Sequence, residues 1–379
     1  MIYLDNAATT NPKPKSVIDA VTHSLEAYSA NPGRAGHDLS INVSEEIYTT
    51  RALAADFFGC EEAEDVIFTP SCTYAINFAL KGILKRGDHV LTSSVEHNAV
   101  IRPLEALRKQ GVMYDIVEVA GKAPEDIVKG FRSKIRYNTK AIVCMHASNV
   151  FGIVLPITEI GQLCKERGLR FIVDSAQTAG KLPIHMKNMN IDFLCIASHK
   201  GLYAPMGTGI LIARKSLGTI IEGGTGTNSR LFVQPEELPE RMESGTVNVP
   251  GIFGIKAGVE FVKEISTIFI YDHEIQLVQT LYDGLKQING VILYTDRPEK
   301  ECNAAVLSFN INGFSSEDIS EMLNENGVAT RAGLHCSPLA HKAFGTETTG
   351  TVRLSPSVFT TVKDIQRTLE YIDFFVKKH

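Results

Sequence analysis

The feature that most constrains the fold of this chain is a series of short apolar runs separated by segments with helical periodicity. The runs cover residues 89–93, 113–119, 141–146, 170–174, 193–197 and 209–213. The helical segments between them cover residues 100–110, 123–135 and 158–167. Continuous apolar strands that alternate with helices are typical of a mainly parallel sheet with both faces covered. The sequence therefore predicts an α/β fold with a doubly wound, mainly parallel sheet.

Polar side chains follow the ends of four of these predicted strands. The clusters are Glu96-His97-Asn98, His146-Ala147-Ser148-Asn149, Asp174-Ser175-Ala176-Gln177 and Ser198-His199-Lys200. In open parallel sheets, ligands bind beyond the carboxyl ends of the strands. The four clusters therefore predict one binding site at this edge of the sheet.

Lys200 and Asp174 have side chains suited to opposite sides of a pyridine ring. A lysine amine can condense with an aldehyde, and a carboxylate stabilises a protonated pyridine nitrogen, as pyridoxal 5'-phosphate requires. We therefore predict this cofactor, with His97 stacked on the ring and with Gln177 and Asn149 near its hydroxyl. Taken singly, Lys200 is compatible with a surface lysine, Asp174 with the partner of a surface cation and His97 with an ordinary turn residue.

A polar turn at residues 69–73 joins a short predicted strand to a helix. Backbone N–H groups and hydroxyls at a helix N-terminus form a natural phosphate site. The residues that we expect to hold the cofactor phosphate are Cys72, Thr73, Ser198 and His199. The alternative for this turn is simple capping of the helix by Ser71 or Thr73.

Composition restricts the class of protein further. A length of 379 residues allows two domains, and the net charge of −5 comes from interspersed acidic and basic residues. We therefore expect no binding to nucleic acid or to membranes. The first residues lack the pattern of a signal peptide, and the seven cysteines form no CxxC pair. These features predict a cytoplasmic protein with reduced thiols and without a metal site.

The remainder of the chain contains loops and a smaller α/β unit. Residues 222–228 read as a flexible loop, and residues 241–248 read as a further binding loop. A short strand is predicted to open the chain at Ile2, and helices are predicted at 252–264 and 271–288. The predicted elements of the smaller unit are strands at 291–295 and 304–310 and helices at 316–326 and 361–377.

Seven segments resemble the cysteine desulfurase and selenocysteine lyase branch of the class V aminotransferase family. They are LDNAATT (4–10), EHNA (96–99), SNVFG (148–152), DSAQ (174–177), SHK (198–200), ESGTVN (243–248) and RAGLHC (331–336). The resemblance covers nearly the whole chain. It implies pyridoxal-phosphate fold type I, with a large cofactor domain at 15–260 and a small domain formed by 1–14 and 261–379. It also implies a homodimer in which the loop bearing Thr246 contacts the cofactor phosphate of the neighbouring subunit.

The resemblance also implies roles that the residue types alone leave open. Cys336 matches the nucleophilic cysteine, and its reactivity requires a thiolate, which Arg331 and His335 are expected to favour. Arg353 matches the arginine that binds the substrate α-carboxylate, helped by Asn149, and the small Ala7 allows substrate to approach. Without the resemblance, Cys336 reads as an unremarkable thiol and Arg353 as a strand residue in a salt bridge.

The implied reaction is the removal of sulfur from L-cysteine. L-Alanine leaves, Cys336 keeps a persulfide for an acceptor protein or a small thiol, and Lys200 moves protons. The alternatives are a selenocysteine lyase acting on L-selenocysteine, another class V aminotransferase or lyase that does not use sulfur, and an inactive sulfur-carrier scaffold. The segment Ser71-Cys72-Thr73-Tyr74 departs from many relatives, which have glycine first and an acidic residue last. The compact loop around Cys336 resembles the group that includes selenocysteine lyases.

Overall fold

A seven-stranded sheet forms the centre of the protein in the computed structural model, which describes residues 1–33, 36–226 and 229–378. Two residues of the loop expected at 222–228, numbers 227 and 228, lie outside the described residues. In spatial order the strands are β2 (Val66–Thr69), β8 (Gly209–Ala213), β7 (Phe193–Ile196), β6 (Arg170–Asp174), β5 (Thr139–Met145), β3 (His89–Ser93) and β4 (Met113–Val117). Strand β8 is antiparallel to both β2 and β7, and the other pairings are parallel. The predicted mainly parallel α/β sheet is thus confirmed.

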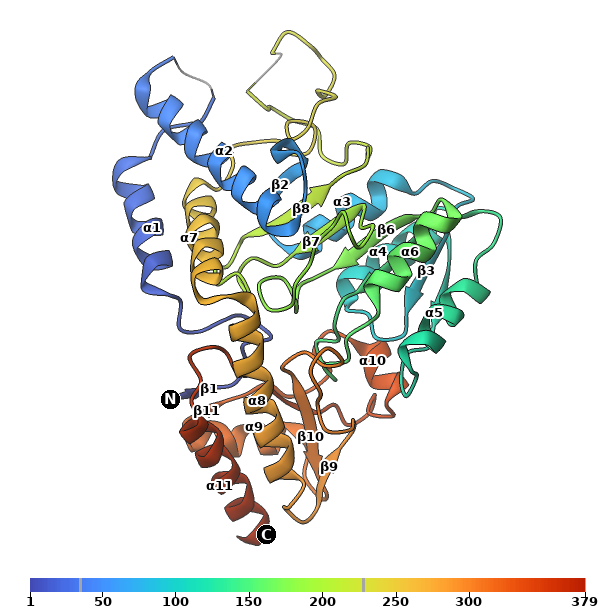
Figure 1. The fold of residues 1–379 in the computed structure, drawn as a ribbon, viewed down its shortest axis with the longest axis vertical. Helices are drawn as coiled ribbons and strands as arrows, with labels where there is room; N and C mark the ends of the chain where they lie inside the picture. Colours follow the sequence, from blue (N-terminus) through green and yellow to red (C-terminus); the bar gives the residue numbers. More distant parts are fainter. Residues whose placement is uncertain (34–35, 227–228, 379) are drawn as a thin grey trace.

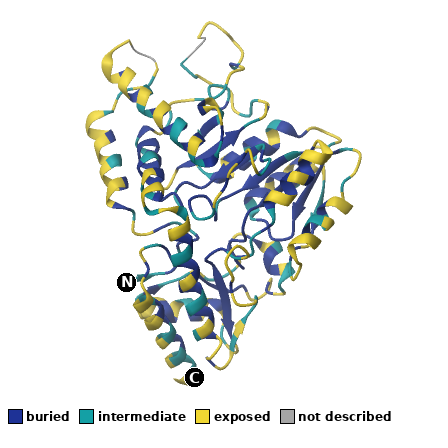
Figure 2. Cartoon of the chain, in the orientation of Figure 1, coloured by how far each residue is buried: buried dark blue, intermediate teal, exposed yellow. Residues whose placement is uncertain are grey.

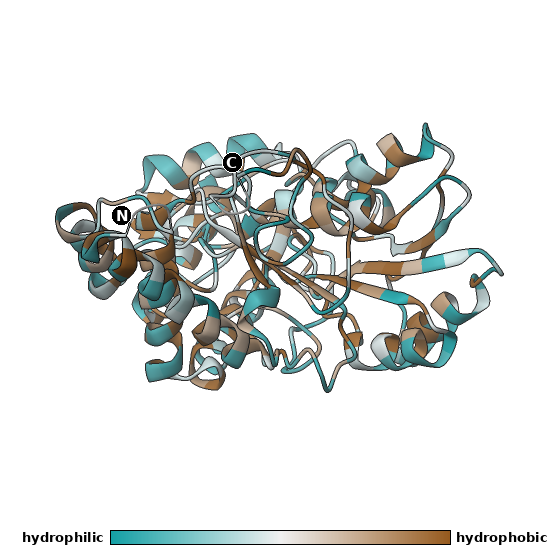
Figure 3. Ribbon diagram, turned by 90° about the horizontal axis from the view of Figure 1, so that it is seen from above, coloured by the Kyte–Doolittle hydropathy of each residue, from teal (hydrophilic) through white to brown (hydrophobic). Residues whose placement is uncertain are grey.

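The sheet is apolar on both faces because helices cover both of them (Figures 1 and 3). In β5, Ile142 and Cys144 belong to one hydrophobic cluster, whereas Ala141 and Val143 belong to the other. Successive side chains of a strand point to opposite faces, so a strand covered on both faces is apolar throughout. This explains the continuous apolar runs, which lie within the buried interior of the molecule (Figure 2).

Helices from several parts of the chain pack against this sheet. One cluster includes side chains of α2, α5, α6 and α7, and the other includes side chains of α3 and α4. The helices of this part of the chain are α1 (Lys15–Ala27), α2 (Asp38–Phe58), α3 (Cys72–Ile83), α4 (Asn98–Arg108), α5 (Pro124–Ser133), α6 (Ile157–Arg167) and α7 (Val249–Ile265). A short 3₁₀ helix, η1 (Ala63–Asp65), precedes β2.

The two ends of the chain meet in a third, separate hydrophobic cluster. Leu4 packs there with Leu277, Leu307 and Ile365, although more than 270 residues of sequence separate it from them. Its strands are β1 (Ile2–Tyr3), β9 (Val291–Leu293), β10 (Leu307–Ile311), β11 (Val328–Ala329) and β12 (Val352–Leu354). Its helices are α8 (Thr267–Leu285), α9 (Ser316–Glu325), α10 (Pro338–Ala343) and α11 (Val362–Lys378). Strand β1 pairs with β11, and β10 lies between β9 and β12.

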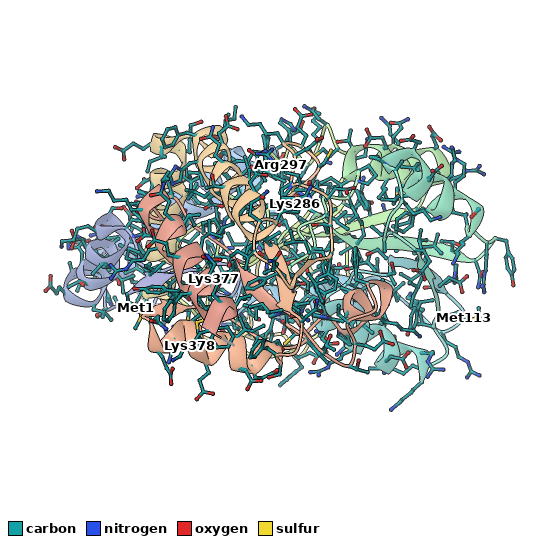
Figure 4. The ribbon with its side chains drawn as sticks, turned by 90° about the horizontal axis from the view of Figure 1, so that it is seen from below. Met1, Met113, Lys286, Arg297, Lys377 and Lys378 are labelled. Carbon is teal, nitrogen blue, oxygen red and sulfur yellow. The ribbon has the colours of Figure 1, made fainter. Side chains whose placement is uncertain are left out.

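Three short elements of this smaller unit, β11, β12 and α10, were not predicted from the sequence. They contain two, three and six residues, which is too short for a periodic pattern. Met1 lies at one side of the molecule and Met113, at the start of the edge strand β4, at the other (Figure 4). Among the described residues, no helix is long and apolar enough to cross a membrane.

Candidate active site

The carboxyl ends of β2, β3, β5, β6 and β7 lie along one edge of the sheet and border a cavity of about 230 Å³. Its lining includes Ala7, Cys72, Thr73, His97, Asn149, Asp174, Gln177, His199, Lys200, Cys336 and Arg353. Two residues predicted for the site, Ser198 and Thr246, do not line this cavity. The parallel strands therefore bring most of the predicted residues together.

Lys200 and Asp174 come from neighbouring strands. Asp174 is the last residue of β6, and its Oδ1 accepts hydrogen bonds from the Ala176 N–H at 2.9 Å and the Cys72 thiol at 3.4 Å. Burial lowers the pKa of Lys200 to about 8, with the Asp174 charge opposing the shift and the Arg353 charge adding to it. A large fraction of Lys200 is thus neutral near pH 8, as a nucleophilic amine must be.

His97 occupies the N-cap position of α4. Its Nδ1 accepts a hydrogen bond from the Ala99 N–H at 3.0 Å. Burial lowers the pKa of His97 to about 4, although the Asp174 carboxylate favours the charged form. The imidazole is therefore neutral at neutral pH and has its proton on Nε2.

The N-terminus of α3 lines the cavity with Cys72 and Thr73. Ser71 is the N-cap residue, yet its side chain makes no capping hydrogen bond. The alternative that Ser71 caps this helix through its hydroxyl is therefore wrong. Gly209 allows the neighbouring strand to approach closely, because a Cβ there would lie 2.5 Å from the Ser71 carbonyl carbon. The first N–H groups of α3 are thus suited to an anion.

Ser198 and His199 precede Lys200 in the turn after β7. Ser198 is buried, and neither its Oγ nor His199 Nδ1 has a hydrogen-bond partner among the described residues. Lys13 Nζ and the Thr10 hydroxyl donate to the His199 carbonyl at 2.8 and 3.1 Å. Burial lowers the pKa of Lys13 to about 8 and that of His199 to about 4. The N-terminal segment therefore fixes the turn that carries Lys200, a role that the sequence did not reveal.

Gln177 and Ala7 are joined directly. Gln177 Nε2 donates to the Ala7 carbonyl at 3.1 Å, and the Ala7 N–H donates to Ser355 Oγ at 2.9 Å. The loop around Ala7 is thereby attached to both the main sheet and the smaller unit.

Arg353 lies in β12 and is 2% exposed. Its Nη2 pairs with Asp5 Oδ1 at 2.6 Å, and its Nη1 donates to the Asn149 carbonyl at 3.0 Å. Its buried Nε has no partner within the described part of the chain. A buried, unsatisfied guanidinium donor is costly. Arg353 is therefore both a strand residue in a salt bridge and a donor suited to a further anion.

Cys336 is exposed and belongs to the segment between β11 and α10. His335 and Cys336 have φ angles of 48° and 58°, in the left-handed region. The Asn98 N–H donates to the Cys336 carbonyl at 2.8 Å, which attaches the segment to α4. The expectation that His335 promotes a thiolate is wrong, because burial lowers the pKa of His335 to about 2 and leaves the ring uncharged. Arg331 lines the same cavity and is a permanent cation beside the segment.

Comparisons with known proteins decide the family. The family model described as Aminotransferase class-V matches residues 2–368. The chain belongs to the class-V aminotransferase family. A relative from Pyrococcus abyssi, named "Probable cysteine desulfurase", is 30% identical over 387 residues, which cover 100% of this chain and 94% of the relative. The apo structure of a cysteine desulfurase from Thermococcus onnurineus NA1 has a TM-score of 0.89 and 30% identity, covering 100% of this chain and 95% of that one.

A second solved structure supports the fold of this member of the class-V aminotransferase family. A cysteine desulfurase of Escherichia coli, solved in an S-sulfonic acid form, has a TM-score of 0.88 at 24% identity and covers 99% of this chain and 94% of that one. These likenesses confirm fold type I.

Thr246 lies apart from the Lys200 cavity in this class-V chain. It lines a different pocket of about 260 Å³, together with Tyr74. Glu243, three residues before Thr246, accepts a hydrogen bond from the Phe68 N–H at 2.6 Å and forms an ion pair with Arg51. The loop bearing Thr246 is thus anchored outside the lining of the Lys200 cavity.

The cavity fits the cofactor that the family implies. The N-terminus of α3, which has no side-chain cap, lines this cavity, and so does His199, whose Nδ1 has no hydrogen-bond partner among the described residues. Both features are suited to a phosphate. Asp174 and Lys200 supply the carboxylate and the amine that the pyridine ring and its aldehyde require. No group of three or more His, Cys, Asp or Glu side chains in the described ranges is arranged to hold a metal ion.

Proposed function

We propose that this chain is a pyridoxal-phosphate-dependent cysteine desulfurase, which converts L-cysteine and the Cys336 thiol into L-alanine and a Cys336 persulfide. The observation that carries the proposal is the presence of an exposed thiol in the same cavity as Lys200 and Arg353. A transaminase of this fold has no use for a thiol there. In the balanced step, the C–S bond of the substrate breaks, an S–S bond to Cys336 forms, and alanine keeps the carbon skeleton.

The cofactor is held by residues from several strand ends. When bound, its protonated ring supplies an electron sink next to the substrate Cα. The residues that we assign to it are Cys72, Thr73, His97, Asn149, Asp174, Gln177, Ser198, His199, Lys200 and, from the neighbouring subunit, Thr246. Asp174 would stabilise the ring proton, and the neutral His97 would contact the ring.

Lys200 acts as the proton carrier. Its Nζ is able to accept a proton because burial lowers its pKa to about 8. It takes the proton from the substrate Cα and returns one to the carbon skeleton before alanine leaves.

Arg353 binds the substrate carboxylate. The unsatisfied Nε supplies one donor for this purpose, and Nη1 and Nη2, which bond to Asn149 and Asp5, each carry a second N–H group. A planar guanidinium held on one side in this way presents a fixed edge to a carboxylate. Asn149 and Ala7 complete the substrate side of the cavity.

Cys336 receives the sulfur and passes it on. Its exposure permits an acceptor protein or a small thiol to reach the persulfide. We assign the protein to the cytoplasm, because a reducing compartment keeps such a thiol free. We further propose a homodimer and a division into a large domain at 15–260 and a small domain at 1–14 and 261–379, supported by the separate cluster that joins Leu4 to Leu307.

The test is turnover of L-cysteine beside L-selenocysteine, with detection of alanine. We expect the wild type to form alanine from L-cysteine and the Cys336→Ala variant to lose this activity while retaining the cofactor absorbance. Cys302 is also exposed, so Cys302→Ala serves as the matched control and should keep full activity. Unchanged turnover in the Cys336→Ala variant would contradict the desulfurase assignment. A preference for L-selenocysteine would identify the lyase activity instead.

A further inference from the structure

The backbone that carries Cys336 needs external support. His335 and Cys336 are consecutive non-glycine residues in the left-handed region, with φ angles of 48° and 58°. Such residues are strained and persist only where surrounding contacts hold them. The contacts around Cys336 therefore determine where its thiol lies.

Asn149 supplies two of these contacts, one on each side of Cys336. Its Nδ2 donates to the His335 carbonyl at 2.9 Å, and its Oδ1 accepts a hydrogen bond from the Ser337 hydroxyl at 2.7 Å. Asn149, His335 and Ser337 are all buried, whereas Cys336 between them is exposed. The Asn149 side-chain amide thus bonds to the residues on both sides of Cys336.

The His335 carbonyl determines which way this amide faces, and the Ser337 hydroxyl then holds the amide in that orientation. With the amide turned over, Asn149 Oδ1 would face the His335 carbonyl oxygen, and two acceptors cannot bond to each other. The hydroxyl donates to Oδ1 and leaves Nδ2 directed at His335. One N–H of Asn149 stays available, because an amide has two donors.

Asn149 is also joined to the substrate side of the cavity. Arg353 Nη1 donates to the backbone carbonyl of Asn149 at 3.0 Å. The chain Ser337, Asn149, Arg353 therefore links the nucleophile segment to the proposed carboxylate site through buried hydrogen bonds, which cost more to break than exposed ones.

We propose that Ser337 is a positioning residue that holds the Cys336 thiol in register with the substrate by fixing the Asn149 amide. This inference rests on the proposed function for its catalytic readout. Ser337 does not touch the reacting atoms and acts through Asn149.

The test compares Ser337→Ala with Ser24→Ala in the full-length holoenzyme. Ser24 is a matched control, because it is also buried and its hydroxyl donates within α1, to the Val21 carbonyl at 2.7 Å. We expect Ser337→Ala to lower kcat for alanine formation roughly tenfold, since slight misplacement of a reacting group is costly, with KM changed less than about threefold. Ser24→Ala should keep the wild-type kcat well below its melting temperature, even where the two variants lose similar stability.

A second measurement does not depend on turnover. Amide hydrogen exchange in the peptide covering residues 334–340 should be about fivefold faster in Ser337→Ala and unchanged in Ser24→Ala, since loss of a buried hydrogen bond promotes local opening. A wild-type kcat in Ser337→Ala, or unchanged exchange in this peptide, would overturn the proposal. Failure of the wild type to form alanine would instead refute the proposed function, and the exchange experiment would still decide the role of Ser337.

Discussion

The two reactive residues of the cavity, Lys200 and Cys336, differ in how the protein supports them. Lys200 follows the fully buried strand β7, and local backbone hydrogen bonds close its turn, from the Lys200 N–H to Ala197 and from the Tyr203 N–H to Lys200. Lys13 and Thr10 add bonds from the N-terminal segment to the neighbouring His199 carbonyl. Cys336 lies on a strained left-handed turn that depends on side chains from elsewhere in the sequence. The comparison separates a lysine held in a backbone turn, the proposed proton carrier, from an exposed thiol, the proposed sulfur carrier, which must be both held and accessible.

The largest effect is expected when the amine of Lys200 is removed, which tests its side of the comparison directly. Lys200→Ala should lower alanine formation at least ~10³-fold, because a positioned general acid and base is lost. It should also prevent borohydride from fixing the cofactor to the protein. Cofactor fixed covalently to another peptide of the wild type would contradict the assignment of Lys200. Cys336→Ala should leave this labelling intact, which distinguishes the role of Cys336 from that of Lys200.

A smaller effect is expected at the carboxylate site that adjoins the Cys336 segment. Arg353→Lys removes the planar fork and leaves Asp5 with a point charge, so KM for L-cysteine should rise roughly 30-fold with a lesser change in kcat. Arg367→Lys is the control, since the Arg367 side chain lies on the exposed face of α11 and bonds to Tyr371. An unchanged KM in Arg353→Lys would contradict the assignment of Arg353 to the substrate carboxylate.

The smallest predicted effect concerns the pH dependence of cofactor uptake by Lys200. The pKa of Lys200 is lowered to about 8, so the reactive neutral amine is the minor form below that pH and the major form above it. The rate of cofactor uptake by the cofactor-free protein should therefore rise about tenfold between about pH 7 and about pH 9 and then level off. Stopped-flow absorbance measures this rate. A rate that falls with increasing pH would show that Lys200 is not the group that limits uptake.

The features that the sequence predicted well are those set by local patterns. Continuous apolar runs predicted the sheet, and the polar residues after them predicted which side chains gather at its edge, including Asp174, Lys200 and His97. In a parallel sheet the carboxyl ends of the strands lie at one edge, so residues that follow different strands come together there. This is why a site assembled from distant segments was visible in the sequence.

The features that the sequence missed depend on partners far along the chain. The charge of His335 was misjudged because burial, which lowers its pKa, is a property of the folded protein. The support of His199 by Lys13 and the pairing of Arg353 with Asp5 join residues separated by 186 and 348 positions. Ser198 is buried and does not line the cavity, although its two chain neighbours, Ala197 and His199, both line it.

The first 13 residues have a consequence for how the two anchors of the site are spaced. Asp5 pairs with Arg353, the proposed substrate anchor, and Thr10 and Lys13 bond to the turn that carries Lys200, the proposed cofactor anchor. The stretch from Asp5 to Thr10 therefore ties the two proposed anchors to each other. An inserted residue in this stretch would leave both anchors chemically intact and would break the match between these two bonds.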